Sequence, residues 1–387
     1  MLLFALKMMM GDKAKFIGIL IGLTFASFII TQQAGIFLGL MERTYGFVTD
    51  TSQPNIWVMD SKVEHIEDIK TMKATRLFRV RGIEGVEWAV PLYKGMLKAR
   101  LSSGNYQICN IVGIDDSSLI GGPPRMLEGK VTDLRYPDAV IVNDVGAKDR
   151  LAHHATNPKA PRIPLHLGEV FEINDKRAQV VGFCRVGRTF RSEPVIYTTF
   201  DRGINYSPSE RNLLTFILVK SKPGVNPKKL CKHIKNITGL AAYTDKQFKR
   251  LTVQYFIKNT GILVNFGFAV FLGFLIGAVI AGQTFYNFAL DNLRYFGTYK
   301  AMGATNRLLT KMVMVQALLV GTIGWGFGIG LTTLFGILSA GTELSFILPW
   351  YLLVGSGIAI LLMTLISALL SLWKILRLEP AIVFQSS

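Results

Sequence analysis

The sequence contains few cysteines and histidines, which limits the sites that it can build. Only three of its 387 residues are cysteine and five are histidine. Cys109, Cys184 and Cys231 form no C-x-x-C pair, so a disulfide-rich scaffold and a thiolate zinc site are both excluded. Two states remain open for these thiols. Either one pair is oxidised and leaves one thiol over, or all three are buried and free.

The histidines do not form a metal-binding pattern. His153 and His154 are adjacent and His166 follows later. Adjacent side chains point to different faces of a regular element, and we find no cysteine or acid at zinc-type spacing. We therefore expect no metal site and no catalytic residues in this region.

Charged residues are scarce and unevenly distributed. Half of the residues are hydrophobic, 18% are charged and the mean hydropathy is +0.35. This composition is too apolar for an ordinary soluble enzyme and too charged for a bundle made only of spanning helices. Residues 42–258 hold 34 Lys and Arg against 22 Asp and Glu. A large basic domain is therefore inserted into a membrane protein.

Four apolar runs are long enough to span a bilayer, for which about 20 residues suffice. The first run is longer than the core of a signal peptide and has no cleavage site, so we expect it to stay as a helix. Because cations gather on the cytoplasmic side, both termini are expected inside. The expected segments are an N-terminus with the first span (1–41), an outer domain (42–258), a second span (259–285), a cytoplasmic loop (286–311), a third span (312–338), a short outer loop (339–346), a fourth span (347–373) and a cytoplasmic tail (374–387).

The outer domain mixes strand-like runs with helical ones, and their alternation is too irregular for a doubly wound sheet. We expect an α+β fold made of either one lobe or two. The predicted strands are 55–59, 86–91, 94–101, 106–114, 139–143, 170–174, 178–186, 194–199 and 215–220. The predicted helices are 66–78, 144–151 and 227–238, with a helical stalk at 245–258 that leads into the second span.

Glycines recur inside two of the apolar runs. The second span contains a G-x-x-x-G motif, and the third contains glycine at every second position, which superficially resembles a nucleotide-binding fingerprint. Because no strand precedes that run, helix packing explains it better. The glycines expected at helix contacts are Gly273, Gly277, Gly324, Gly326, Gly328 and Gly330.

A basic island at Tyr286–Thr305 separates the second and third apolar runs. Its apolar residues recur at helical spacing, Gly303 is a candidate helix stop and Thr305 a candidate N-cap for the next helix. Its surroundings hold four cations and a single acid, which are Arg294, Lys300, Arg307, Lys311 and Asp291. A short basic loop of this kind favours the cytoplasm.

Two motifs resemble those of the MacB/FtsX-type ABC transporter permeases. The stretch Arg294–Ala304 is similar to the family pattern R-E-x-G-x-x-(R/K)-A-x-G-A, with Tyr295 where the family usually has Glu. The tail Leu378–Phe384 is similar to L-D-P-A-x-x-F, with Glu379 in place of Asp. The order of one span, a large domain and three spans also resembles this family, and most closely the DevC-like exporters.

The resemblance implies a non-catalytic permease subunit in the bacterial inner membrane, working as a homodimer or with a paired permease. The chain has no G-x-x-x-x-G-K-[ST] loop, so ATP and Mg²⁺ are expected on a separate cytoplasmic ATPase, with no cofactor in this chain. A periplasmic adaptor and an outer-membrane duct are further expected partners besides the lipid bilayer, and no nucleic acid is expected.

The island would then be the coupling helix that sits in a groove of the ATPase. Its expected packed face is Leu293, Phe296 and Gly297, while Arg294 and Lys300 meet acidic groups. The expected coupling residues are Leu293, Arg294, Tyr295, Phe296, Gly297, Lys300, Gly303 and Ala304.

Three functions stay open at this stage. The first is export. The second is mechanotransmission without transport, which would activate a cell-wall hydrolase or extract a lipoprotein. The third is an outer domain that acts alone as a receptor or enzyme, which would leave the basic island unexplained.

Overall fold

A computed structural model describes residues 13–154, 162–208, 214–340 and 342–376. The first cationic residue, Lys7, and the family-like tail motif lie outside the described residues. The chain divides into two compact units. A sheet unit comprises Met41–Thr260, and a helical unit comprises Met1–Leu40 with Gly261–Ser387.

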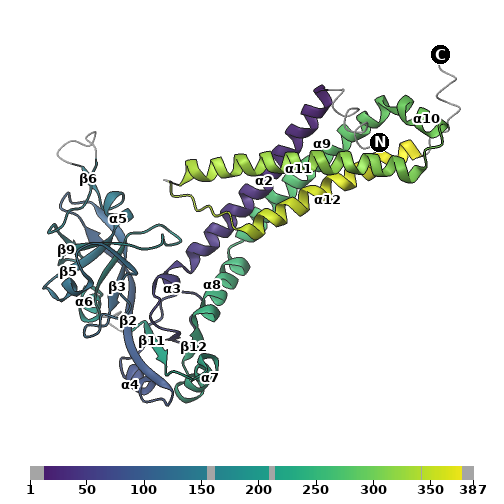
Figure 1. Ribbon diagram of the computed structural model, residues 1–387. Coiled ribbons are helices and arrows are strands. Elements are labelled where there is room, and N and C mark those ends of the chain that lie inside the picture. Colours follow the sequence, from purple (N-terminus) through teal and green to yellow (C-terminus); the bar gives the residue numbers. More distant parts are fainter. Residues whose placement is uncertain (1–12, 155–161, 209–213, 341, 377–387) are drawn as a thin grey trace. The chain divides into compact units, whose positions relative to one another are not determined.

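Four long helices form the helical unit (Figure 1). They are α2 (Lys13–Thr44), α9 (Ile262–Asp291), α11 (Asn306–Ser339) and α12 (Trp350–Leu376). All four are long and apolar enough to cross a membrane. The helices extend beyond the apolar runs, because α9 continues past Phe285 and α11 begins before Met312. The island therefore contains the last turns of α9 and a short helix, α10 (Leu293–Ala301), and it ends directly before α11.

Small and polar side chains join the long helices. Ser27 of α2 donates a hydrogen bond to the backbone oxygen of Trp325 in α11 at 3.3 Å. Ser371 of α12 donates to the backbone oxygen of Phe285 in α9 at 2.8 Å. In an apolar environment such bonds satisfy hydroxyls that have no water to bind. They fix the rotation of each helix against its neighbour.

The sheet unit is built on one mixed sheet in which β2 (Val86–Arg100) is central (Figure 1). The strands follow the order β12 (Ala241–Thr244), β1 (Ile56–Met59), β11 (Phe216–Ser221), β2, β3 (Tyr106–Ile114), β10 (Val195–Thr199), β5 (Ala139–Asn143), β9 (Lys176–Arg185) and β4 (Arg125–Glu128). The β3–β10 and β5–β9 pairs are parallel and the other pairs on this path are antiparallel. β8 (Val170–Ile173) pairs with β2 and β9, while β6 (His153–His154) and β7 (Arg162–Ile163) pair with each other.

The two strands predicted at 86–91 and 94–101 are one continuous strand, so that prediction was wrong. β2 pairs with β11 over Val86–Leu92 and with β3 over Tyr93–Arg100. Pro91, the last residue of the first predicted strand, lies where β2 has a strand partner on one side only. A proline is tolerated there, because no strand hydrogen bond is lost through its missing N–H. β2 thereby joins two halves of the sheet.

The helix predicted at 66–78 was also wrong, because only α4 (Thr75–Arg81) forms there. The residues before it are held by tertiary contacts. Lys94 of β2 forms an ion pair with Glu67, and the backbone N–H of Met72 donates to the oxygen of Leu214 at 2.6 Å. These contacts outweigh a helical preference that is worth only a few tenths of a kcal/mol per residue.

The remaining helices lie at or near their predicted positions or are short. They are α3 (Gly46–Asp50), the 3₁₀ helix η1 (Val131–Arg135), α5 (Asp144–Lys148), α6 (Phe200–Tyr206), α7 (Pro227–Thr238) and α8 (Asp245–Asn259). The predicted helix at 144–151 ends earlier, at Lys148. The strands β4, β6, β7 and β12 and the helices α3, η1 and α6 were not predicted.

The predicted stalk is α8, and its first turns are fixed to the sheet. Thr244 and Gln247 form a capping box at its start. Asp245 accepts a hydrogen bond from the indole N–H of Trp57 at 2.9 Å, and Trp57 is fully buried in the core beside Phe248 of α8. A movement of this end of α8 would therefore have to move β1 as well.

Candidate functional site

The short helix α10 lies within the basic island, with a turn at each end (Figure 1). Asn292 separates it from α9, and its side chain donates a hydrogen bond to the backbone oxygen of Phe288 at 2.8 Å. Gly303 has φ +94°, a conformation that ends helices and favours glycine. Thr305 then caps α11 by accepting from the N–H of Leu308. Local sequence thus defines both ends.

The apolar side of α10 packs inside the helical unit. Phe296 is 1% exposed and belongs to the core of that unit, with Tyr299 and Ala304 packed beside it. Gly297 is also buried. Phe296 and Gly297 are therefore covered within the chain itself, and the packed face that they would present to a partner stays a prediction. Leu293 is half-buried.

The solvent-facing side of α10 carries an aromatic ring, a thioether and a cation. Tyr295 is 61% exposed and Met302 is 69% exposed, and Arg294, directly before Tyr295, is exposed as well. Tyr295, Thr298 and Met302 follow the i, i+3, i+7 spacing of one helix face. We call Arg294, Tyr295, Thr298 and Met302 the exposed face of α10. Met302 was not among the predicted site residues, although this spacing identifies it.

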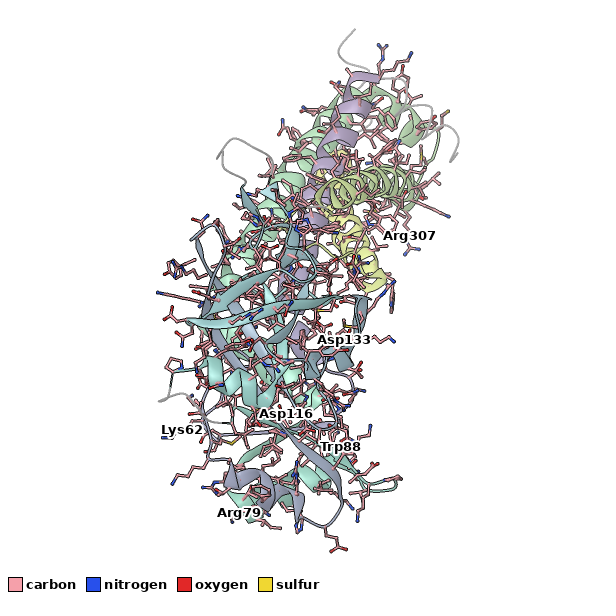
Figure 2. The ribbon with its side chains drawn as sticks, turned by 90° about the vertical axis from the view of Figure 1, so that its left-hand side faces the viewer. Lys62, Arg79, Trp88, Asp116, Asp133 and Arg307 are labelled. Atoms are coloured by element: carbon pink, nitrogen blue, oxygen red, sulfur yellow. The ribbon has the colours of Figure 1, made fainter. Side chains whose placement is uncertain are left out.

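The charge around α10 is basic. Asp291 at the end of α9, the single acid in the sequence 286–311, forms an ion pair with Lys15 of α2. Lys300 is half-buried, whereas Arg307 at the start of α11 is exposed and points away from the helices (Figure 2). The remaining positive charge favours an acidic partner surface.

Four of the six predicted packing glycines face another helix. A methyl group on Gly277 would lie 2.5 Å from Cβ of Ala26, and one on Gly324 would lie 2.7 Å from Cβ of Leu23. Gly273 and Gly328 face α2 in the same way. Gly326 and Gly330 have open space within the chain, so a helix contact at these two positions stays a prediction. Successive helix residues turn by about 100°, so alternate glycines lie on opposite sides.

The sheet unit brings two of the histidines to one carboxylate. His153 and His166 each place Nδ1 at 3.6 Å from an oxygen of Glu169, an acid that the spacing argument overlooked. Among the described residues, no group of three or more His, Cys, Asp or Glu side chains is arranged to hold a metal. The side chain of His154 lies outside the described residues.

All three cysteines are buried and free, which is the second of the two states expected. Burial raises the pKa of Cys184 and of Cys231 to about 12, and it raises the pKa of Cys109 still further. Because the thiolate is the reactive form, these thiols are inert at neutral pH.

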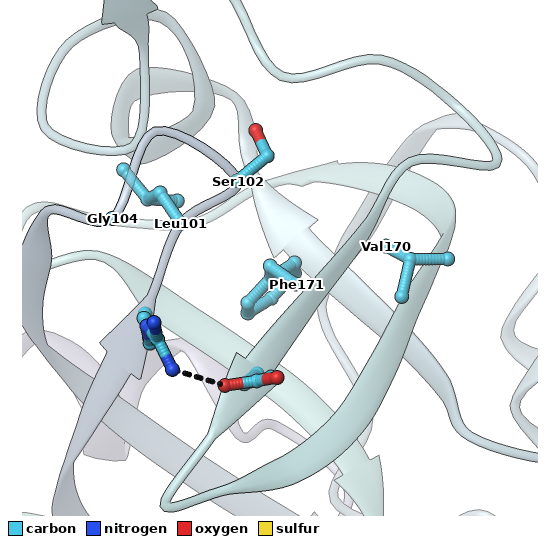
Figure 3. A pocket seen from close by; sticks show the side chains of 7 residues that line it. Leu101, Ser102, Gly104, Val170 and Phe171 are labelled. Carbon is cyan, nitrogen blue, oxygen red and sulfur yellow. Dashed lines mark hydrogen bonds and ion pairs between the residues drawn. The ribbon is translucent and has the colours of Figure 1, made fainter.

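A shallow depression lies where the β2–β3 turn meets β8 (Figure 3). Its two charges, on Arg100 and Glu172, pair with each other at 3.5 Å. Both side chains are about half exposed, so the pair contributes little to stability. The two charged groups of this depression are thus already paired with each other.

Comparison with known proteins gives one family match, and it lies in the helical unit. Residues 267–380 match the family model described as FtsX-like permease C-terminal. The matched range begins within α9 and includes α10, α11 and the described part of α12. This part of the chain is therefore similar to the C-terminal domain of FtsX-like permeases.

Solved structures with similarity to the chain are distant. The extracellular domain of the noncanonic ABC-type transporter YknZ from Gram-positive bacteria is 15% identical, with 49% of this chain and 98% of that one covered and a TM-score of 0.34. The periplasmic region of MacB from Actinobacillus actinomycetemcomitans is 15% identical, with 55% and 96% covered and a TM-score of 0.36. A domain of a putative permease protein from Porphyromonas gingivalis is 12% identical, with 49% and 86% covered and a TM-score of 0.28. No curated protein matches the chain.

Proposed function

We propose that this chain is the membrane-spanning permease subunit of an ABC transporter, driven by a separate ATPase through α10. The observation that carries the proposal is the position of α10 inside the FtsX-like match, between two membrane-length helices. Its exposed face offers Tyr295 and Met302 for apolar contact and Arg294 for an acidic group. A helix that was only a connector would have no need of this exposed apolar surface.

The proposal places α10 and both termini in the cytoplasm of a bacterial cell, with the sheet unit outside the inner membrane. The cations around α10 support this orientation. ATP and Mg²⁺ belong to the ATPase, and this chain supplies no catalytic group. A second permease copy or a paired permease completes the assembly.

Export is the direction that we propose, with the DevC-like exporters as the subgroup that the length and layout of the chain resemble. Mechanotransmission is the second candidate, and the anchoring of α8 favours it. Asp245 and Phe248 fix α8 to Trp57 in the sheet, so motion of α8 would be passed to the sheet unit. Cross-linking the sheet unit in cells separates the two functions. Export predicts an adaptor as the captured partner, and mechanotransmission predicts a hydrolase or a lipoprotein carrier.

Replacing Tyr295 with aspartate is expected to reduce co-purification of the ATPase at least about ten-fold. An added carboxylate would lose its water in the contact and would oppose the acidic groups expected to meet Arg294, and about 1.4 kcal/mol is enough for this factor. The measurement is the ratio of ATPase to permease after affinity purification from membranes.

Tyr136→Asp is the matched control, because Tyr136 is 63% exposed but lies in the sheet unit. It should leave the ratio unchanged. Equal ATPase recovery with Tyr295→Asp and the control would argue against α10 as the contact. Loss of the permease itself from membranes would reveal a folding defect, and Met302→Asp then repeats the test at the other end of the exposed face.

A further inference from the structure

A cavity of about 310 Å³ lies inside the sheet unit, beside the C-terminal end of α8. Met96 of β2 and three other parts of the chain form its walls. The segment between β1 and α4 provides His65 and Glu67, the segment between β9 and β10 provides residues 189–191 and 193, and α8 provides Tyr255 and Phe256. Its volume is at the lower end of the range for small-molecule sites.

Aromatic rings form the apolar walls of this cavity. Tyr255 of α8 packs on His65, with ring centroids 4.2 Å apart, and Phe256 packs on Phe190, with centroids 4.7 Å apart. Burial lowers the pKa of His65, so its ring is neutral at neutral pH. Each of the two connecting segments thus packs one ring against α8. Together, these rings favour a ligand whose central part is apolar or aromatic.

The charged groups around the cavity are of both signs. Glu67 is paired with the buried Lys94, which offsets its charge and fixes its position. Arg191 and Glu193 also line the cavity, two residues apart on the same segment. Neither a simple cation nor a simple anion complements this pair as well as a ligand that carries both charges.

A buried hydroxyl in the wall also lacks a partner. Thr189 is 9% exposed, and its Oγ1 makes no hydrogen bond to any of the described residues. Leaving such a group unsatisfied costs about 1–3 kcal/mol. A polar group on a bound ligand would satisfy it, so this hydroxyl is a second sign, independent of the charges, that the cavity is built for an occupant.

We propose that the cavity binds a small zwitterionic ligand with an apolar or aromatic body, of the amino-acid or short-peptide class. Arg191 would bind its carboxylate, Glu193 its ammonium group, and the rings of Tyr255 and Phe190 its body. The volume equals that of about ten waters, which suits a dipeptide and excludes a folded partner. The ligand would touch α8 and both connecting segments at once.

The test is calorimetric titration of the full-length protein in nanodiscs with the dipeptide leucyl-phenylalanine, its N-acetyl form and its C-terminal amide. The free dipeptide is expected to bind at least ten-fold more tightly than either blocked form, which is about 1.4 kcal/mol. Arg191→Gln should weaken the free dipeptide by a similar factor but leave the amide unchanged. Glu193→Gln should weaken the free dipeptide but leave the N-acetyl form unchanged.

Arg188→Gln is the control, since Arg188 belongs to the same connecting segment but does not line the cavity. It should bind all three peptides as the unmodified protein does. Equal affinity for the three peptides, or no detectable heat at about 10 mM dipeptide, which corresponds to under 3 kcal/mol of binding free energy, would overturn the proposal. So would binding that neither Arg191→Gln nor Glu193→Gln changes.

Discussion

Replacing Glu67 with glutamine is expected to lower the free energy of unfolding of the sheet unit by about 3 kcal/mol. The side chain of Lys94 is fully buried, and Glu67 is the carboxylate that pairs with it. The ammonium nitrogen also lies 5.7 Å from the ring centroid of Phe47. Removing the carboxylate leaves a buried cation without its ion-pair partner, and the attraction of one aromatic ring offsets only part of that cost.

Lys94→Met is expected to cost less than half as much, although it breaks the same ion pair. Methionine fills much of the space of the lysine stem, and Glu67 is 26% exposed, so water can solvate the carboxylate that remains. Native-state hydrogen exchange of the β1 and β2 amides in the full chain measures both variants. Equal losses, or a larger loss for Lys94→Met, would contradict this explanation of the pair.

Replacing Gly328 with leucine is expected to disrupt the packing of α11 on α2. Even a methyl group there would overlap Ser27 and come within 2.9 Å of the backbone oxygen of Thr24. A backbone atom cannot relieve the overlap by a rotamer change, as a flexible side chain can. The two helices would therefore have to separate. That loses the contact of Gly324 with Leu23 and the hydrogen bond from Ser27 to Trp325. The expected loss is about 3 kcal/mol or more.

Gly330→Leu provides the matched control, because Gly330 lies on the same helix and has open space around it within the chain. It should leave stability within about 0.5 kcal/mol of the unmodified protein. Thermal unfolding of the purified protein in one detergent compares the two variants. A similar fall in Tm for both would mean that Gly328 does not lie at a helix contact.

Elements defined by local signals were the ones that the sequence predicted well. Asn226 caps α7, Pro227 is its first residue, and Gly239 follows it with φ +71°. Both ends of this helix are therefore defined by residues next to them in the sequence. The incorrect predictions involve distant partners. The helix expected at 66–78 is replaced by contacts to Lys94 and Leu214, which lie far away in the sequence.

The basic island was predictable, but the direction of its side chains was only partly so. An apolar residue on a short helix can pack on its own chain or on a partner, and sequence alone does not distinguish them. Phe296 packs on its own chain. The spacing of Tyr295 and Met302 on one face, in contrast, follows from helix geometry alone and was available from the sequence. The same geometry separates Gly324 and Gly328 from Gly326 and Gly330.

The most direct test of the account is maleimide labelling of a Met302→Cys variant in oriented membrane vesicles. The native cysteines are buried with raised pKa values, so they should contribute little background. We predict rapid labelling by a membrane-impermeant reagent in inside-out vesicles, strong protection when the ATPase is bound, and no labelling in right-side-out vesicles. Labelling in right-side-out vesicles, or equal labelling with and without the ATPase, would contradict a coupling role for α10.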